Sequence, residues 1–303
     1  MKNSCDQKTS AQNYETSRTN LPDWFKQEIP SLECLENSRR LGRSGINTVC
    51  VEAKCPNLPL CFKQRKLTFM ILGSVCTRSC GFCAVKKFKA RLPEPDKMEP
   101  QKIAEAVVDL NITYAVITSV SRDDLDDGGA KQFLDTCNAI HKTSPSVLVE
   151  VLIPDFQGKI ASLKTVLEAE PVVIGHNIET VNRLYPILRP EADYQRSLKV
   201  LRSLKQLSSS IVTKSSMMLG LSESEDEVIS TMSDLLANGC DILTLGQYLS
   251  PSTDHKPINE FISPEKFRSY RETALTMGFK SVLSGPLVRS SFEAEQTYRR
   301  SCR

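Results

Sequence analysis

The chain has 303 residues, of which 40% are hydrophobic and 25% charged, a composition typical of an ordinary globular protein with one large domain or two smaller ones. Its net charge of +3 is too small to indicate a nucleic-acid-binding protein. The longest apolar runs are far shorter than the ~20 residues of a membrane helix, and the first thirty residues lack the apolar core of a secretory signal. We therefore expect a cytoplasmic protein with no membrane and no nucleic-acid partner.

The N-terminal part of the chain is polar and leads into a cysteine-rich segment. Residues 1–30 show no clear periodicity, so we expect a flexible arm, and 30–45 (PSLECLENSRRLGRSG) is compatible with a short helix. The stretch NTVCVEAKCPNLPLCF then places Cys50, Cys55 and Cys61, here called the first trio, at a C-x4-C-x5-C spacing. We predict that residues 31–65 form an extension that binds metal.

From residue 66 onward the pattern alternates between strand and helix. The candidate strands are short, and several are apolar on both faces, as strands of a buried parallel sheet are. Amphipathic stretches lie between them, and the last of these begins with Ser263 as N-cap and ends at Gly278. The candidate strands are 67–73, 114–120, 147–153, 172–178, 211–220 and 242–249, and the candidate helices include 99–110, 129–142, 223–239 and 263–278.

Repeated strand–helix units of this kind predict an α/β fold with a parallel sheet. Six units indicate an incomplete barrel over 66–284, smaller than the eight-unit barrel. In such folds the chemistry lies at the C-terminal ends of the strands. A second group of cysteines directly follows the first predicted strand, so we expect it at this end of the barrel.

This second group lies in GSVCTRSCGFCAV, where Cys76, Cys80 and Cys83, the second trio, are spaced C-x3-C-x2-C with Phe82 before the last cysteine. Structural zinc usually takes four ligands, often as two C-x2-C pairs, whereas each trio offers three thiols. Three thiolates on a 4Fe-4S cluster leave one iron free for a ligand that is not protein. The spacing therefore favours iron–sulfur clusters, with a zinc-stabilised binding module as the alternative from another class.

The remaining cysteines do not extend this pattern. Eleven cysteines are an odd number, and without an export signal they do not suggest a disulfide framework. We expect the other five to be small buried residues or inert surface thiols. They are Cys5, Cys34, Cys137, Cys240 and Cys302.

The second trio, with its aromatic neighbour, resembles the signature of the radical SAM superfamily. Within that superfamily the chain is similar to the lipoyl synthases, whose hallmark is a further trio about fifteen residues upstream, as found here. The resemblance runs from Asn47 to Phe292, about four-fifths of the chain, and departs at Phe292, where the family usually has tyrosine. The matching stretches are TFMILGSVCTRSCGFCAV, TSVSRDDLDDGGA, GHNIETV, TKSSMMLGLSE, LTLGQYLSPS and GPLVRSSF.

The resemblance implies a partial (βα)6 radical SAM barrel with an activity and two cofactor sites. Lipoyl synthases insert two sulfur atoms at C6 and C8 of an octanoyl chain on a carrier lysine, giving lipoyl-lysine, and use two molecules of S-adenosylmethionine (SAM). It implies that Cys76, Cys80 and Cys83 hold the 4Fe-4S cluster that binds SAM, and that the first trio holds an auxiliary 4Fe-4S cluster consumed as sulfur donor. It also implies Ser291 as the fourth ligand of that cluster, with 285–303 closing over it.

The same resemblance suggests which side chains contact SAM. Most of the candidates follow the second and fourth predicted strands, at the barrel mouth, and their hydroxyl, amide and charged groups suit the ribose and the methionyl carboxylate. Some of them also have a structural alternative, which stays open: Thr118 as the cap of a turn, Glu179 as the cap of the next helix, and Arg196 as a surface charge. The candidates are Phe82, Thr118, Ser119, Arg122, Asn177, Glu179 and Arg196.

Two polar features are interpreted as structural. His176 lies at a predicted strand end, and we expect it to be a buried histidine with satisfied hydrogen bonds rather than a ligand. The four carboxylates of DDLDDGG (123–129) are expected to form a solvated loop and helix start, not a metal site.

The partners implied by the resemblance are octanoylated carrier domains, namely the E2 subunits of 2-oxoacid dehydrogenases and the H protein of glycine cleavage. A low-potential electron donor and an iron–sulfur carrier for cluster repair are implied as well. The nearest rival enzyme is a radical SAM methylthiotransferase. Such proteins have a larger N-terminal domain and usually a C-terminal nucleic-acid module, and this sequence shows neither.

Overall fold

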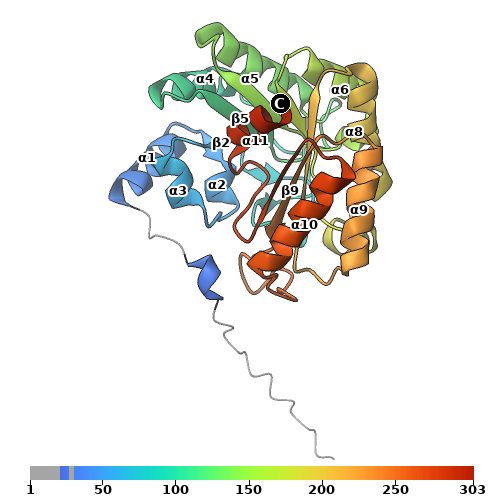
Figure 1. Cartoon of the computed structure of the whole chain (residues 1–303). Helices are drawn as coiled ribbons and strands as arrows, with labels where there is room; N and C mark the ends of the chain where they lie inside the picture. The colour runs from blue at the N-terminus through green and yellow to red at the C-terminus, as the bar shows by residue number, and fades with distance from the viewer. Residues whose placement is uncertain (1–20, 27–30) are drawn as a thin grey trace, which may run out of the picture.

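The computed structural model describes residues 21–26 and 31–303 (Figure 1). Most of the arm expected over 1–30, including Cys5, therefore lies outside the described residues, as does the side chain of Cys34. The described part of the arm forms the 3-10 turn η1 (Asp23–Phe25). The ring of Phe25 is buried and packs against Phe261 with ring centroids 5.6 Å apart, which attaches this part of the arm to the C-terminal half.

An eight-stranded, mostly parallel sheet organises the chain. Its strand order is β1-β2-β5-β6-β7-β8-β9-β10, and only β1 is antiparallel to its neighbour. All six predicted strands are confirmed, and so is the α/β class. Within the described strands β1 pairs only with β2 and β10 only with β9, so the sheet curves without closing. The strands are β1 (Asn47–Thr48), β2 (Thr68–Ile71), β5 (Tyr114–Ser119), β6 (Leu148–Leu152), β7 (Val173–Gly175), β8 (Val212–Leu219), β9 (Ile242–Gln247) and β10 (Ser281–Gly285).

The seventh parallel strand, β10, was not predicted. Its sequence, SVLSG, has only two aliphatic residues, and serine and glycine at the other positions weaken the strand pattern. The hydroxyl of Ser284 is satisfied by donating to the carbonyl of Phe267 at 2.7 Å. Parallel pairing with β9, in which Ser281 is opposite Ile242, supplies the remaining hydrogen bonds. Tertiary pairing thus forms a strand that local propensity does not indicate.

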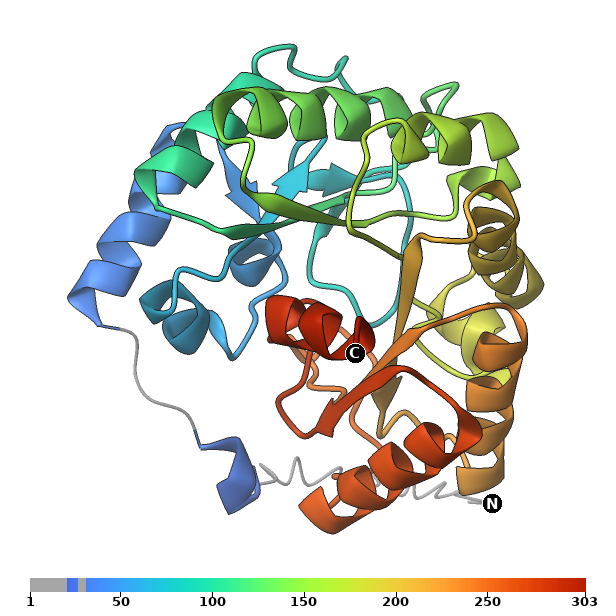
Figure 2. The same ribbon diagram turned by 45° about the horizontal axis from the view of Figure 1, so that its top comes forward.

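Helices cover the outer face of the curved sheet (Figure 2). The four predicted helices are confirmed as α4, α5, α9 and α10, and α10 begins and ends as expected. The Ser263 hydroxyl accepts the Lys266 N–H at 3.2 Å, and Gly278 takes a φ of +116°, which a side chain would strain. These outer elements are α4 (Glu99–Asp109), α5 (Ala130–Thr143), η2 (Phe156–Gly158), α6 (Ile160–Leu167), η3 (Asn182–Leu184), α7 (Tyr185–Leu188), α8 (Tyr194–Leu207), α9 (Glu225–Ala237) and α10 (Pro264–Met277).

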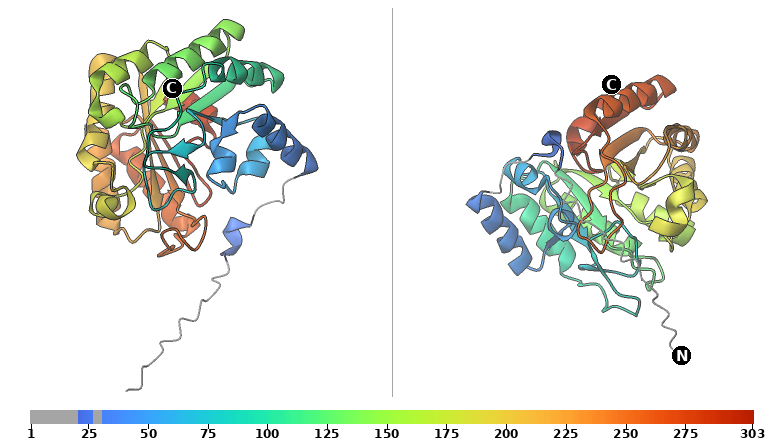
Figure 3. Two further views of the ribbon diagram at one scale, coloured as in Figure 1. Left: turned by 180° about the vertical axis from the view of Figure 1, so that it is seen from behind. Right: turned by 90° about the horizontal axis from the view of Figure 1, so that it is seen from below.

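The N-terminal extension lies at the β1–β2 edge of the sheet, where both views of Figure 3 place its helices. The expected helix over 30–45 is confirmed as α1 (Leu32–Arg43). The first trio follows on two short helices, α2 (Val49–Glu52) and α3 (Leu58–Lys63), and on the turn between them. A small parallel ribbon, β3 (Val75–Cys76) and β4 (Lys86–Lys87), frames the loop of the second trio.

The C-terminal helix α11 (Ala294–Ser301) lies inside the curve of the sheet rather than outside it (Figure 2). Ala294 and Tyr298 pack against Tyr114 and Val116 of β5, with the two tyrosine rings 6.2 Å apart. Tyr114 is the first residue of its strand, so α11 covers the amino end of the interior. No helix of the described residues is long and apolar enough to cross a membrane.

Candidate active site

A cavity of about 630 Å³ occupies the interior of the sheet, and all six clustered cysteines line it. This volume lies within the range of small-molecule and cofactor sites. The first trio lines it from the N-terminal extension, and the second trio lines it from the loop after β2. Two cysteine groups with different spacings therefore line the same cavity.

The loop of the second trio is held by backbone hydrogen bonds to several elements. Phe88 N–H donates to the Cys76 carbonyl at 2.9 Å, and Gly81 N–H donates to the carbonyl of Leu188 at 2.9 Å. From the other side, the Nε2 of His255 lies 3.1 Å from the Cys83 carbonyl oxygen. The three thiols are therefore presented by a fixed backbone, which is the condition for a preformed ligand set.

Burial makes the thiols of both trios poor acids as long as no metal is bound. Burial, together with the charge of neighbouring cysteines, raises the pKa of Cys83 and of Cys61 to about 12, and that of Cys50 to about 11. Burial also raises the pKa of Cys80. A buried thiol of this kind ionises when a bound cation compensates its charge, as iron does.

The arrangement of the thiols suits a cluster better than a single ion. Within the described part of the chain, no group of three or more His, Cys, Asp or Glu side chains is gathered closely enough to hold one metal ion. Structural zinc needs such a convergent set. The three thiolates of a 4Fe-4S cluster bind different irons, so they need not converge on one point.

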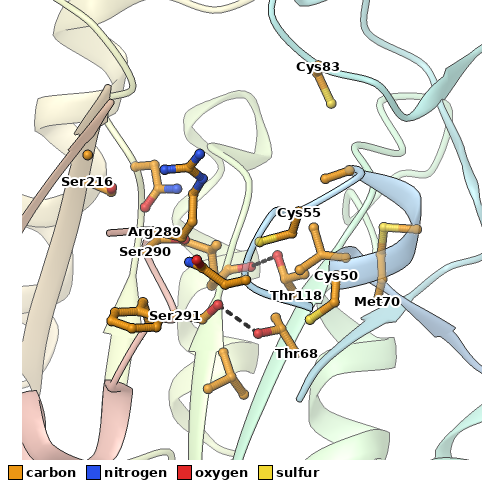
Figure 4. Close-up of a pocket in the computed structure, with 18 of the residues that line it drawn as sticks. Cys50, Cys55, Thr68, Met70, Cys83, Thr118, Ser216, Arg289, Ser290 and Ser291 are labelled. Atoms are coloured by element: carbon orange, nitrogen blue, oxygen red, sulfur yellow. Dashed lines mark hydrogen bonds between the residues drawn. The ribbon is translucent and has the colours of Figure 1, made fainter. Parts of the chain in front are cut away.

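The C-terminal segment lies beside the first trio, although the strands from β2 to β10 separate the two in the sequence. Figure 4 shows Cys50 and Cys55 facing the segment that carries Arg289, Ser290 and Ser291. The hydroxyl of Thr68, at the start of β2, donates to Ser291 Oγ at 2.7 Å. Ser291 therefore lines the same cavity as the first trio, although 223 positions separate it from its hydrogen-bond partner.

Five of the seven predicted SAM-contact residues line this cavity: Phe82, Thr118, Ser119, Asn177 and Glu179. Thr118 donates its hydroxyl to the Leu152 carbonyl at 2.9 Å, whereas the buried hydroxyl of Ser119 has no hydrogen-bond partner among the described residues. Glu179 accepts from Asn177 Nδ2 at 3.1 Å, and burial raises the pKa of its carboxyl.

The other two predicted contacts, Arg122 and Arg196, are placed elsewhere. Neither lies among the described residues that line the cavity. Arg122 is buried in an ion pair with Asp124 at 2.8 Å, and Arg196 pairs with the buried Asp155 at 2.8 Å. Each guanidinium is thus occupied by a carboxylate that adjoins it in the fold, and each stabilises a loop instead of facing the interior.

Arg189 is a cavity residue that the sequence did not indicate. Its guanidinium lies 5.1 Å above the ring of Tyr185, donates to that tyrosine's hydroxyl at 2.8 Å, and forms no ion pair among the described residues. Its Nε is buried without a hydrogen-bond partner in the described part of the chain. Arg189 therefore supplies a positive charge beside Glu179 and Cys80, which its place after a short helix did not reveal.

The structure changes the interpretation of His176 in one respect. The residue is buried, as expected, and its Nδ1 lies 3.0 Å from the Ile153 carbonyl oxygen. Its Nε2, however, finds no hydrogen-bond partner in the described residues, and the side chain lines the cavity. Burial lowers the pKa of His176 to about 4, so the ring is neutral and only half satisfied.

The DDLDDGG loop is less solvated than expected. Asp123 accepts two hydrogen bonds from the buried Arg78, at 2.6 and 2.8 Å. Asp127 accepts the backbone N–H groups of Gly129 at 2.8 Å and Lys131 at 2.7 Å at the start of α5, so the predicted helix start is confirmed. Three of the four carboxylates, counting Asp124 on Arg122, are occupied by neighbours, which explains why they do not gather into a metal site.

The cysteines outside the trios behave as expected where they are described. Cys137 and Cys240 are buried, and Cys302 is exposed. All the described cysteines are free thiols.

The fold and the paired cysteine groups define a class of protein. The sequence model of the Radical SAM superfamily matches residues 70–235, which contain the second trio and most of the sheet. A solved methylornithine synthase (PylB) has the same fold, with a TM-score of 0.55 at 12% identity over 77% of this chain and 68% of that one. HydG, a maturase of the FeFe-hydrogenase, gives a TM-score of 0.54 at 13% identity over 77% of this chain and 62% of that one.

Curated relatives narrow the class to one family. A lipoyl synthase of Caldicellulosiruptor saccharolyticus is 50% identical over 281 residues, which cover 92% of this chain and 98% of that protein. Lipoyl synthases of Rubrobacter xylanophilus and Desulfotalea psychrophila are 50% and 47% identical, over 93% and 96% of this chain and 88% and 97% of theirs. The chain belongs to the lipoyl synthase family. It is therefore a radical SAM enzyme, a class that uses SAM with a 4Fe-4S cluster, and neither a methylthiotransferase nor a zinc-stabilised binding module.

Proposed function

We propose that this chain inserts sulfur at C6 and C8 of an octanoyl group that is amide-linked to a lysine of a lipoyl-carrier protein, giving lipoyl-lysine. The observation that carries the proposal is the presence of two cysteine trios on one cavity, with Ser291 brought to the first of them. Membership of the lipoyl synthase family indicates the reaction. The geometry supports a division of labour between two iron–sulfur sites in the same space.

In this proposal the second trio holds the 4Fe-4S cluster that binds SAM. A cluster on three thiolates leaves one iron open, and SAM bound there supplies the radical that removes hydrogen from an unactivated C–H bond. The chain holds these thiols on a loop that is fixed by hydrogen bonds to several elements. Ser119, whose hydroxyl has no partner among the described residues, and the hydrogen-bonded pair of Asn177 and Glu179 then orient SAM.

Arg189 completes this set as the partner of the methionyl carboxylate. Its guanidinium is buried beside Glu179 but forms no ion pair among the described residues, so an incoming carboxylate would be the first to bind it directly. Asn177 lies beside it, because the Arg189 guanidinium donates to the Asn177 carbonyl at 3.2 Å. The position therefore offers a charge-assisted site for one end of SAM.

Replacing Arg189 with glutamine is expected to raise the KM for SAM about ten- to a hundredfold, because a hydrogen bond to a charged group is worth ~1.5–3 kcal/mol. Iron content should stay unchanged. The matched control is Arg183→Gln, whose guanidinium is exposed and paired with Glu227 at 2.7 Å. Steady-state cleavage of SAM measures the effect, and an unchanged KM in Arg189→Gln would remove this residue from the SAM site.

The first trio, with Ser291, holds the auxiliary cluster that donates sulfur. Serine oxygen is a harder ligand than thiolate, so it binds iron without holding it as firmly as a fourth cysteine would. The Thr68 hydroxyl donates to Ser291 Oγ, which suits an oxygen that has lost its proton on binding metal. The C-terminal segment 285–303 then closes the cavity over this cluster.

The proposed partners follow from the substrate. They are octanoylated E2 subunits of 2-oxoacid dehydrogenases and the H protein of glycine cleavage, a low-potential electron donor, and an iron–sulfur carrier that restores the consumed cluster. An octanoylated carrier domain should be turned over, while free octanoate should not. Equal turnover of free octanoate would contradict a protein-bound substrate.

The deciding experiment combines metal content with product. Anaerobic reconstitution should give brown protein with about eight irons per chain, as two 4Fe-4S clusters require. Mass spectrometry of an octanoylated carrier, incubated with SAM and reductant, should show two sulfur atoms gained and two hydrogen atoms lost. A methylthio product, or colourless protein with stoichiometric zinc, would contradict the proposal.

A further inference from the structure

The C-terminal segment is held tightly on its way to the cavity. A Cβ atom at Gly246, on β9, would lie 2.0 Å from the Val288 carbonyl oxygen, so the two backbones touch there with no room for a side chain. The Gln247 N–H donates to the Pro286 carbonyl at 3.3 Å. On the far side of the cavity, Thr68 holds Ser291. The segment is thus fixed against β9 at one end and against β2 at the other.

A third contact joins this segment to the loop of the first trio. Asn57, between Cys55 and Cys61, donates from Nδ2 to the carbonyl oxygen of Leu287 at 2.6 Å. Only 1% of the Asn57 surface is exposed, so the hydrogen bond is shielded from water. Leu287 precedes Ser291 by four residues. The side chain of Asn57, in the loop of the first trio, therefore binds the backbone of the segment that carries Ser291.

The position of Asn57 makes this use of its side chain unusual. Asn57 is the N-cap residue of α3, where asparagine ordinarily accepts an N–H of the first helical turn. Its side chain makes no such capping bond in the described structure. The backbone carbonyl of Asn57 instead accepts the Cys61 N–H at 2.9 Å. The residue thus holds Cys61 with its backbone and the C-terminal segment with its side chain.

We propose that Asn57 is a positioning residue that sets Ser291 against the first trio. The inference rests on the proposed role of Ser291 as a ligand. Because Cys61 and Leu287 are both held by Asn57, a shift of the cysteine loop carries the C-terminal segment with it, and the serine stays in register with the thiols. Without the side-chain amide, the Leu287 carbonyl loses this partner, and the segment keeps its contacts with β9 and Thr68 but loses its hydrogen bond to the cysteine loop.

The test uses Asn57→Asp and Asn57→Ala in the full chain. Aspartate caps helices as well as asparagine does, but it presents a carboxylate to the Leu287 carbonyl in place of a donor. If Asn57 acted only as a cap for α3, Asn57→Asp would behave like the unaltered protein. The proposal expects both variants to show the same two changes, a less protected C-terminal segment and an altered auxiliary cluster. Gln64→Ala is the matched control, since Gln64 ends the same helix and lines the same cavity.

Two readouts follow, neither of them turnover. Hydrogen exchange of the 287–292 amides should be about tenfold faster in both variants, as expected for loss of a shielded hydrogen bond. In a background with Cys76, Cys80 and Cys83 changed to alanine, only the auxiliary cluster remains. Its Mössbauer spectrum in Asn57→Asp should then approach that of Ser291→Ala, while Gln64→Ala should match the unaltered chain.

The outcomes separate the inference from the proposed function. Normal exchange and a normal spectrum in Asn57→Asp, with an altered spectrum in Ser291→Ala, would overturn the positioning role alone. An unaltered spectrum in Ser291→Ala would overturn the ligand role, and the positioning role with it. If Asn57→Ala fails to fold, seen as loss of SAM cleavage in the otherwise unaltered protein, Asn57→Asp decides the matter.

Discussion

Changing Cys76, Cys80 and Cys83 together to alanine is expected to abolish SAM cleavage and to lower the iron content from about eight to about four per chain. The reason is that no other described thiols face that side of the cavity, since Cys137 and Cys240 are buried elsewhere in the core. Iron analysis and the yield of 5′-deoxyadenosine measure the result. Cys302→Ala, at an exposed position, is the control and should change neither.

The converse change removes the first trio. With Cys50, Cys55 and Cys61 as alanine, about four irons should again remain, but SAM cleavage should stay measurable while lipoyl formation stops. The two triple variants should thus have equal iron content and opposite effects on cleavage. Lipoyl product from the second variant would show that the sulfur comes from another source.

Ser291→Ala should lower lipoyl formation by at least about a hundredfold while 5′-deoxyadenosine still forms, because loss of an essential group in a catalytic unit costs orders of magnitude. The first trio would then hold a cluster whose fourth iron lacks its protein ligand. Ser291→Cys should keep the cluster and also fail, since thiolate retains the iron that must leave. Product analysis and cleavage assays on the same samples separate the two effects.

Ser290→Ala is the matched control for this prediction. Ser290 lines the same cavity one residue earlier, but the Thr68 hydroxyl donates to Ser291 and not to Ser290. Its effect should be mild. An equal loss of lipoyl product in Ser290→Ala would contradict the assignment of Ser291 as the ligand. Normal lipoyl product from Ser291→Ala would mean that the segment is an ordinary turn.

Local pattern predicted most of the sheet because its strands are continuous apolar runs. β5 illustrates this, since five of its six residues are buried. β10 escaped prediction because its hydrogen bonds come from β9 and not from any preference of SVLSG. The cysteine spacings likewise placed both trios on the cavity, because short spacings keep ligands together whatever the rest of the chain does.

Charged residues were harder to place, because their role depends on partners distant in the sequence. Arg122 follows β5 and Arg196 lies in the first turn of α8, and each pairs with a carboxylate, Asp124 or Asp155, outside the cavity lining. Arg189 lines the cavity beside Glu179 and forms no ion pair among the described residues. The role of Asn57 could not be predicted from its place between Cys55 and Cys61. It follows only from the hydrogen bond to Leu287, 230 positions away.

The two hydrogen bonds that bring the C-terminal segment to the first trio span 223 and 230 residues. Contacts of such sequence separation form late in folding, because the loop-closure entropy must be met before they contribute. The barrel can therefore assemble its strands in order along the chain while the segment is still loose and the six thiols remain reachable. We therefore expect iron to be loaded before the segment docks, and docking to be the last step of maturation.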